Sequence, residues 1–215
     1  MTTADTVTAD TVTPVDTPHG PAQVHLDEPG GVPRGLLVLG HGAGGGVEAP
    51  DLLGARTAAR EAGLAVARVL QPYRVAQRKA PPPAAQLDTA WAAVVEHLTT
   101  VVPDVPQIHG GRSSGARVAC RGAGALGPVA VLALAFPLLA PARKDGTRPD
   151  RGPEIDAVTV PVLAVSGERD RFGVPEPTAT REVVVIAGDH ALRARGPVAA
   201  AVGPWLEQVL SHEPA

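Results

Sequence analysis

Three side chains that can build a nucleophilic triad occur in the order Ser113, Asp170 and His190. A serine hydroxyl is a weak nucleophile at neutral pH, so it needs a base to take its proton and an anion to orient that base. The segment from Gly111 to Gly115 matches G-x-S-x-G, a tight strand-to-helix turn that exposes the central serine. We therefore predict Ser113 as nucleophile, His190 as general base and Asp170 as the acid that holds the imidazole.

Other residues compete for two of these roles. Glu168 and Asp189 are alternatives for the acid, and Asp189 ranks lower because side chains of adjacent residues, here Asp189 and His190, tend to diverge. His41 and His109 are alternatives for the base. We expect His41 to brace a glycine-rich loop and His109, which lies inside a strand, to be a core histidine.

The glycine-rich loop H-G-A-G-G, residues 41–45, follows the first long apolar segment. Glycines let a backbone approach a substrate closely and turn an amide inward. We predict that the backbone amides of Ala43 and Ser114 form an oxyanion hole, which stabilises the charge that develops on the substrate oxygen. The supporting positions are His41, Gly42, Gly44, Gly45, Gly111 and Gly115.

The same loop allows a competing interpretation, because Gly40, Gly42 and Gly45 match the dinucleotide fingerprint G-x-G-x-x-G. That fingerprint requires an acidic residue at the end of the next strand. Here the next strand ends at Leu70, and Glu61 falls in the preceding helix, so dinucleotide binding ranks well below hydrolysis. The sequence lacks a phosphate-binding P-loop motif and metal-ligand spacing, so we predict no cofactor and no metal.

Apolar segments alternate with helical patterns along most of the chain. We expect a short edge strand at 22–26, further strands at 35–40, 64–70, 107–110, 129–136, 160–166 and 183–187, and helices at 50–62, 84–100, 114–123 and 197–210. Uniformly apolar strands that alternate with helices predict an α/β fold, with a mostly parallel sheet and helices on both faces. His41, Ser113, Asp170 and His190 each follow a strand, at the sheet edge where such folds bind ligands.

The predicted domain is residues 21–215, a single α/β domain. Residues 1–20 contain the repeat T-A-D-T-V and few bulky apolar side chains, so they are predicted to be a disordered tail. Between the strands that end at Phe136 and begin at Val160 there is no room for a large cap.

The same interval contains a loop with four basic residues, Arg143, Lys144, Arg148 and Arg151. These residues either favour an anionic substrate or form a solvated basic surface, and the second interpretation is favoured. We expect Arg112 and Arg117 to pair with loop carboxylates.

The composition of the chain limits the classes of partner that it can bind. The net charge of −3 and the scarcity of aromatic residues argue against nucleic acid binding, and no apolar run is long enough to span a membrane. Without a secretory signal pattern, the predicted location is cytoplasmic.

Cys120 is the only cysteine and is expected to be a buried residue rather than a nucleophile. Only Lys79 and Lys144 are lysines among 19 basic residues, which points to a GC-rich bacterial genome.

The chain resembles the compact α/β-hydrolases of the dienelactone-hydrolase-like group, in particular the small serine-hydrolase-like family that includes testis-expressed protein 30. The motifs that carry the resemblance are HGAGG, GGRSSGAR, FPLLAP, SGERDRFG and GDHAL, within residues 41–192. The family usually has GGRSMGGR, and here Ser114 and Ala116 replace the Met and the following Gly. Dienelactone hydrolases use a cysteine nucleophile where Ser113 stands, so their substrate cannot be carried over. The resemblance implies a hydrolase fold and a Ser113–Asp170–His190 triad.

The predicted function is an esterase-like serine hydrolase acting on a small soluble ester, thioester or amide, through an acyl-enzyme intermediate. Its predicted partner is a small-molecule acyl substrate, with no nucleic acid and no membrane. The alternative is a non-catalytic interaction module on the same fold, because some relatives act in that way. Ester hydrolysis that depends on Ser113 distinguishes the two.

Overall fold

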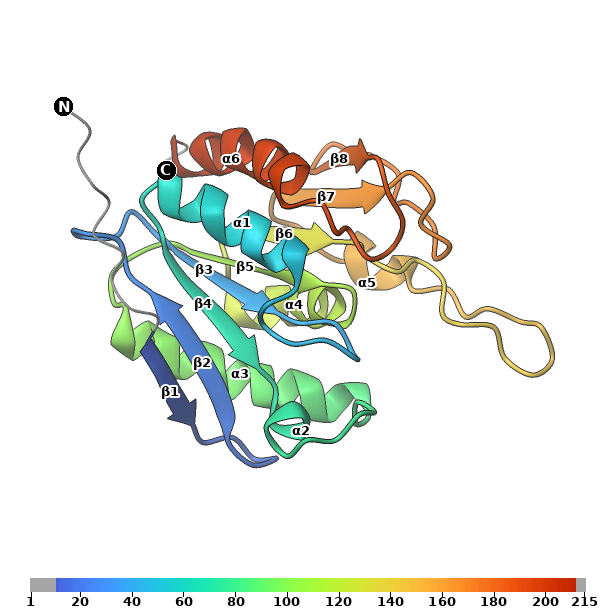
Figure 1. Ribbon diagram of the computed structural model, residues 1–215, viewed down its shortest axis with the longest axis horizontal. Coiled ribbons are helices and arrows are strands. Elements are labelled where there is room, and N and C mark those ends of the chain that lie inside the picture. Colours follow the sequence, from blue (N-terminus) through green and yellow to red (C-terminus); the bar gives the residue numbers. More distant parts are fainter. Residues whose placement is uncertain (1–10, 212–215) are drawn as a thin grey trace.

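The computed structural model describes residues 11–211, and residues 1–10 and 212–215 lie outside the description. A single eight-stranded sheet runs through the described chain in the order β1-β2-β4-β3-β5-β6-β7-β8 (Figure 1). The strands are β1 (Thr11–Val15), β2 (Ala22–Asp27), β3 (Leu36–Gly40), β4 (Ala65–Leu70), β5 (Gln107–Arg112), β6 (Ala130–Leu134), β7 (Val162–Gly167) and β8 (Arg181–Ile186). The helices are α1 (Pro50–Glu61), α2 (Pro72–Val75), α3 (Ala84–Val101), α4 (Ser114–Leu126), α5 (Gly152–Asp156) and α6 (Arg195–Ser211).

Neighbouring strands run parallel from β4 through β3, β5, β6 and β7 to β8, whereas β2 is antiparallel to both β4 and β1. The central strands are buried throughout, as their unbroken Val, Leu and Ala content requires for a sheet covered on both faces. The predicted mostly parallel α/β sheet is confirmed. It aligns the carboxyl ends of β3, β5, β7 and β8 at one edge, and this alignment positions the candidate site.

Helices cover both faces of the sheet (Figure 1). On one face, α3 and α4 bury Trp91, Leu98 and Ala119 against the sheet. On the other face, α1 and α6 pack together and bury Leu52 and Trp205. With few aromatic residues available, both cores consist largely of Ala, Val and Leu, which lets helices and strands approach closely.

The disordered tail predicted for residues 1–20 is wrong for the part that the structure describes, while residues 1–10 lie outside it. Thr11–Val15 forms β1, which pairs with β2 along its whole length, and Val15 is buried. Four of the five residues of β1 are β-branched, which favours a strand, and Pro14 is tolerated because β1 lies at the edge of the sheet. The strand predicted at 22–26 therefore exists as β2 but is not an edge strand.

The segment between β6 and β7 contains only the short helix α5 and an extended hairpin-like loop, in which Leu139 bridges to Asp150. This loop projects from the body of the protein (Figure 1). The prediction of a single domain without a large cap is therefore confirmed. The short helices α2 and α5 were not among the predicted elements. Among residues 11–211, no helix is both long enough and apolar enough to cross a lipid bilayer.

Candidate active site

Ser113 occupies the sharp turn between β5 and α4. Its backbone lies at φ 50° and ψ −108°, a conformation that is costly for a residue with a side chain. The turn is held because the Ser113 amide donates to the carbonyl of Leu134 in β6 at 2.8 Å. The Ser113 carbonyl then accepts the first helical hydrogen bond of α4, from the amide of Arg117 at 3.2 Å. Strain at this one residue lifts its hydroxyl above the edge of the sheet.

The two glycines of the G-x-S-x-G pattern both pack against the end of β3. A Cβ atom on Gly111 would lie 2.3 Å from the carbonyl oxygen of Gly40, and one on Gly115 would lie 2.2 Å from the same oxygen. Gly111 also has φ 157°, which residues with side chains rarely adopt. A Cβ atom on Gly40 would in turn lie 3.1 Å from the Cα atom of Gly115. Close packing against this turn therefore accounts for a glycine at position 40 without a bound dinucleotide. The strand that follows, β4, ends without a carboxylate.

Ser113, His190 and Asp170 are joined by hydrogen bonds although they lie far apart in the sequence. His190 Nδ1 donates to Asp170 Oδ2 at 2.7 Å, and the Ser113 hydroxyl donates to His190 Nε2 at 2.9 Å. The Asp170 side chain is fully buried, and its Oδ1 accepts the amide of Phe172 at 2.9 Å. Both oxygens of the carboxylate are therefore engaged, which fixes the imidazole with Nε2 directed at the serine.

The competing acids and bases lie elsewhere. Asp189 and Glu168 are exposed; Asp189 accepts the amide of Ala191, and Glu168 pairs with Arg169. His41 is buried and uses both ring nitrogens, since Nδ1 donates to the Gly42 carbonyl at 2.8 Å and Nε2 accepts the amide of Gln71 at 3.1 Å. It braces the glycine-rich loop, as expected.

His109 and Cys120 are also core residues rather than reacting groups. His109 is fully buried, packs edge-on against Trp91 and donates from Nε2 to the side chain of Gln107. Burial lowers the pKa of His109 to about 4. Cys120 is buried in α4, and burial raises the pKa of its thiol to about 12, so it stays an unreactive thiol at neutral pH.

The predicted oxyanion donors line the same hollow as the nucleophile. An open pocket of about 420 Å³ is lined by Ala43, Gly44, Ser113, Ser114 and His190, together with residues of the projecting loop. Ser114 is the first residue of α4, where backbone amides have no acceptor within the helix. The backbone of Ala43 is fixed by a hydrogen bond, because the Tyr73 hydroxyl donates to its carbonyl oxygen at 2.7 Å. Gly42 and Gly45 close the loop through a 3.0 Å backbone hydrogen bond.

Two supporting contacts at the site were not predicted. Arg112 donates from Nη2 to the backbone carbonyl of His190 at 2.8 Å and from Nε to buried Asp51 in α1 at 2.7 Å. Burial raises the pKa of Asp51, and the charge and hydrogen bond of Arg112 oppose that rise. The prediction that Arg112 pairs with a loop carboxylate is wrong, because its partner Asp51 lies in the helix α1. Phe172 packs edge-on against the His190 ring at 4.5 Å, and its only sequence signal is its place beside Asp170 in SGERDRFG.

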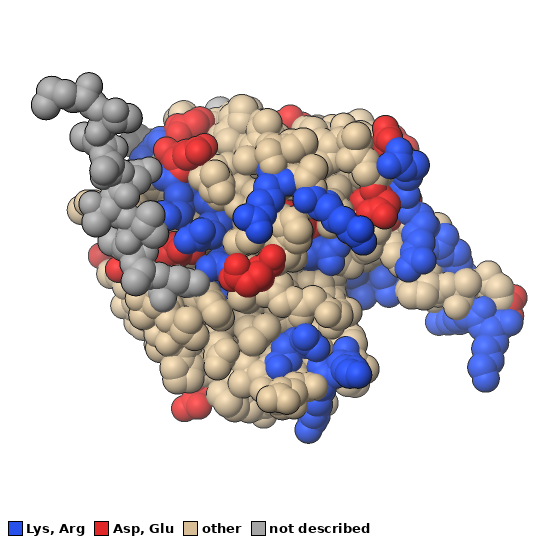
Figure 2. All heavy atoms as spheres, in the orientation of Figure 1, with Lys and Arg blue, Asp and Glu red and all other residues tan. Residues whose placement is uncertain are grey.

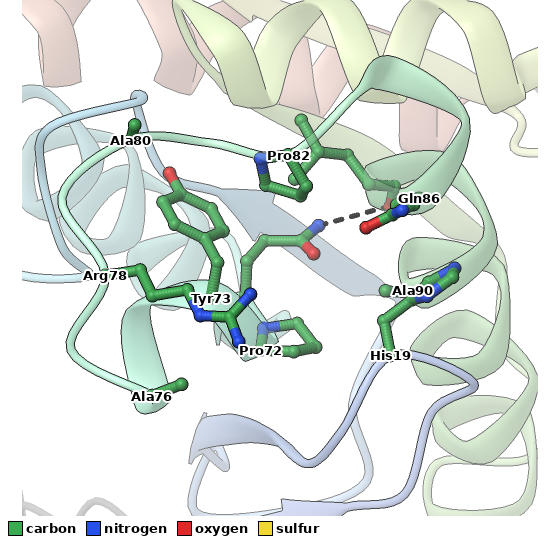
Figure 3. Close-up of a pocket in the computed structure, with 11 residues that line it drawn as sticks. His19, Pro72, Tyr73, Ala76, Arg78, Ala80, Pro82, Gln86 and Ala90 are labelled. Carbon is green, nitrogen blue, oxygen red and sulfur yellow. Dashed lines mark hydrogen bonds between the residues drawn. The ribbon is translucent and has the colours of Figure 1, made fainter.

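A second pocket lies beside this site, between α2, α3 and the segment that precedes β2. It is lined by His19, Pro72, Tyr73, Arg78 and Gln86, among others (Figure 3). Tyr73 lines this second pocket, and its hydroxyl donates to the carbonyl of Ala43, which lines the pocket of Ser113. Across residues 11–211, no cluster of three or more His, Cys, Asp or Glu side chains is arranged to hold a metal ion.

A family model for an α/β-hydrolase domain matches residues 33–200, which include the nucleophile turn and both of its partners. The chain belongs to this α/β-hydrolase family, as its resemblance to compact hydrolases predicted. A search of curated protein sequences returned no match.

Solved structures support the same assignment of fold. An α/β serine hydrolase without a lid from Xanthomonas campestris superposes with a TM-score of 0.78 at 21% identity, over 96% of this chain and 98% of that chain. Est1E from Butyrivibrio proteoclasticus gives 0.74 at 18% identity, over 94% and 99%. Dienelactone hydrolase from Anabaena variabilis gives 0.70 at 17% identity, over 92% and 96%. At such low identities these similarities concern the fold alone.

Proposed function

We propose that this protein is a serine hydrolase that cleaves small esters or thioesters through an acyl-enzyme intermediate. The observation that carries the proposal is the hydrogen-bonded chain from Ser113 through His190 to Asp170, set at the edge of a hydrolase-family sheet. A structural role alone would not require a strained serine whose hydroxyl donates to an imidazole already oriented by a buried carboxylate.

In the first half of the reaction, Ser113 Oγ attacks the acyl carbon while its proton passes to His190 Nε2. The backbone amides of Ser114 and Ala43 donate hydrogen bonds to the carbonyl oxygen and stabilise the negative charge that develops on it. When the tetrahedral intermediate collapses, the bond to the alcohol or thiol breaks. The leaving group takes the proton from His190, and the acyl group remains on Ser113.

In the second half, water attacks the acyl-enzyme and His190 takes one of its protons. Collapse of the second tetrahedral intermediate releases the carboxylic acid and returns the proton to Ser113. The sum is ester plus water to acid plus alcohol. Asp170 stays ionised throughout and stabilises the imidazolium that forms twice in each cycle.

Hydrolysis of 4-nitrophenyl acetate and of an acetyl thioester by the purified protein tests this proposal. We expect Ser113→Ala to lower kcat by roughly 10⁴-fold or more, as removal of a triad nucleophile does elsewhere. Ser211→Ala, which changes a serine at the end of α6, serves as the matched control. No hydrolysis by the folded unmodified protein would favour the non-catalytic interaction module, and equal hydrolysis by Ser113→Ala and the unmodified protein would exclude Ser113 as the nucleophile. A small soluble acyl substrate and a cytoplasmic location remain predictions.

A further inference from the structure

Three arginines line the pocket that contains Ser113, and two of them are already paired. Arg112 is bound by Asp51 and by the carbonyl of His190. Arg117 donates from Nε at 2.7 Å and from Nη2 at 2.5 Å to the two carboxylate oxygens of Glu154. Arg151 is the third, and within residues 11–211 its guanidinium makes no ion pair and no hydrogen bond, although the charge of Glu154 acts on it from nearby.

The backbone of Arg151 is fixed even though its side chain is unpaired. Its amide donates to the Leu138 carbonyl at 2.7 Å, and its own carbonyl accepts the amide of Glu154 at 3.0 Å. It thus stands where the projecting loop returns to the body of the protein and α5 begins. Lys and Arg side chains are numerous along this loop (Figure 2). Arg143, near the tip of the loop, is exposed and does not line the pocket, whereas Arg151 is half-buried and does.

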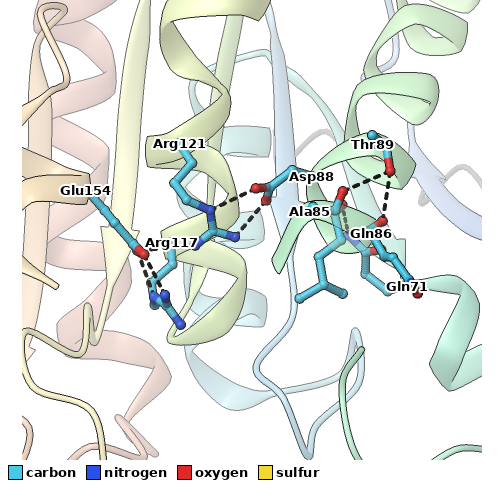
Figure 4. A network of polar contacts seen from close by, with 9 residues as sticks. Gln71, Ala85, Gln86, Asp88, Thr89, Arg117, Arg121 and Glu154 are labelled. Atoms are coloured by element: carbon cyan, nitrogen blue, oxygen red, sulfur yellow. Dashed lines mark hydrogen bonds and ion pairs between the residues drawn. The ribbon is translucent and has the colours of Figure 1, made fainter. Parts of the chain in front are cut away.

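The carboxylates of the ion-pair network beside Arg151 are already bound by other arginines. Arg121 pairs with both oxygens of Asp88 and with Glu154, which also holds Arg117, so α3, α4 and α5 are joined by one network (Figure 4). Arg117 and Arg121 thus occupy both carboxylates of this network, Asp88 and Glu154, and Arg151 forms no ion pair with either of them. Burial and the nearby charges of Arg117 and Arg121 lower the pKa of Arg151, and the charge of Glu154 opposes that fall. Of the three arginines that line the pocket, Arg151 is therefore the one whose guanidinium remains available to a substrate anion.

We propose that Arg151 binds a negatively charged group of the substrate, so that the preferred substrates are esters or thioesters that also carry an anionic group such as a carboxylate. The planar guanidinium of arginine matches a carboxylate with two parallel hydrogen bonds, and such charge-assisted bonds are stronger than neutral ones. The inference rests on the proposed hydrolase function and adds the substrate class. Arg117 contributes its charge to the same side of the pocket while Glu154 holds it in place.

Hydrolysis of monoethyl succinate, which carries one carboxylate, and of its neutral analogue diethyl succinate tests the proposal. The measured quantity is the ratio of the two kcat/KM values, from acid release at constant pH. We expect Arg151→Gln to lower the ratio by roughly tenfold or more, because one charge-assisted hydrogen-bonded pair is lost. Arg143→Gln removes the same charge from the same loop outside the pocket, and should leave the ratio within about twofold. An equal change of the ratio in both variants would overturn the proposal.

Binding can be measured without catalysis, which separates this inference from the hydrolase function. Monoethyl succinate is titrated calorimetrically into Ser113→Ala and into the double variant Ser113→Ala/Arg151→Gln. We expect roughly tenfold weaker binding to the double variant. Equal affinities, or no binding to either protein, would contradict the anion site. A clear difference in binding, combined with no hydrolysis by the unmodified protein, would support the anion site and reject the hydrolase function.

Discussion

The carbonyl oxygen of Gly40 lies only 2.2 Å from the position that a Cβ atom on Gly115 would occupy. The end of β3 and the first turn of α4 therefore touch backbone to backbone. This contact sets how closely the glycine-rich loop after β3 approaches Ser113. It also explains why the pattern G-x-S-x-G needs its last glycine, since the obstructing atom is rigid backbone and not a side chain that could move aside.

Gly115→Ala should destabilise the protein by about 3 kcal/mol, at the upper end of the cost of overpacking a core, because α4 must move away from β3. Gly124→Ala is the matched control, since Gly124 lies in the same helix with open space around its Cβ position. It should stabilise the protein by about 1 kcal/mol through helix propensity. Urea denaturation of the two variants measures both effects, and equal stabilities would contradict the packing argument.

Asp170→Asn should lower kcat/KM for an activated ester by roughly 10³–10⁴-fold, because an amide no longer holds His190 in the tautomer that accepts the serine proton. The side chain keeps its size, so the fold should be unchanged. Asp189→Asn tests the rival acid in the same assay. Asp189 is exposed and its carboxylate accepts the amide of Ala191, so the activity of this variant should stay within about twofold of that of the unmodified protein. A larger loss in Asp189→Asn would reassign the acid.

Stability should fall as the pH is lowered from about 6.5 towards 4, partly because of His109. Its pKa is lowered to about 4 by burial in the folded protein, whereas in the unfolded chain it is close to 6.5, so only the unfolded chain takes up a proton in this range. The contribution is about 1.4 kcal/mol per pH unit, or about 2 kcal/mol between pH 6.5 and 5. Free energies of unfolding at about pH 7 and pH 5 for the unmodified protein and His109→Leu measure it. Equal pH dependence in both would contradict a buried neutral His109.

The parallel sheet and the order of its helices could be predicted because the strands are uniformly apolar and the helices carry apolar stripes. β1 could not, since Thr11–Val15 is almost wholly exposed and owes its structure to pairing with β2, a long-range contact that leaves little trace in the local pattern. The short helices α2 and α5 are too brief to show helical periodicity.

At the site, Ser113, Asp170 and His190 could be selected because each follows a strand of a parallel sheet. Local patterns do not show which groups support them from other elements. Asp51 lies in α1, 61 residues from Arg112, and Tyr73 reaches Ala43 from α2. The difference between Arg151 and the other arginines of its loop also depends on folding, because the same residue type is exposed at Arg143 and lines the pocket at Arg151.

The most direct test of the account is labelling of the purified protein with a fluorophosphonate, which reacts covalently with serines that a neighbouring base activates. We expect the fluorophosphonate to label the unmodified protein and Ser211→Ala, and to leave Ser113→Ala unlabelled. Circular dichroism verifies that all three proteins are folded. Absence of labelling in the folded unmodified protein, or labelling that persists in Ser113→Ala, would contradict the assignment of Ser113 as an activated nucleophile.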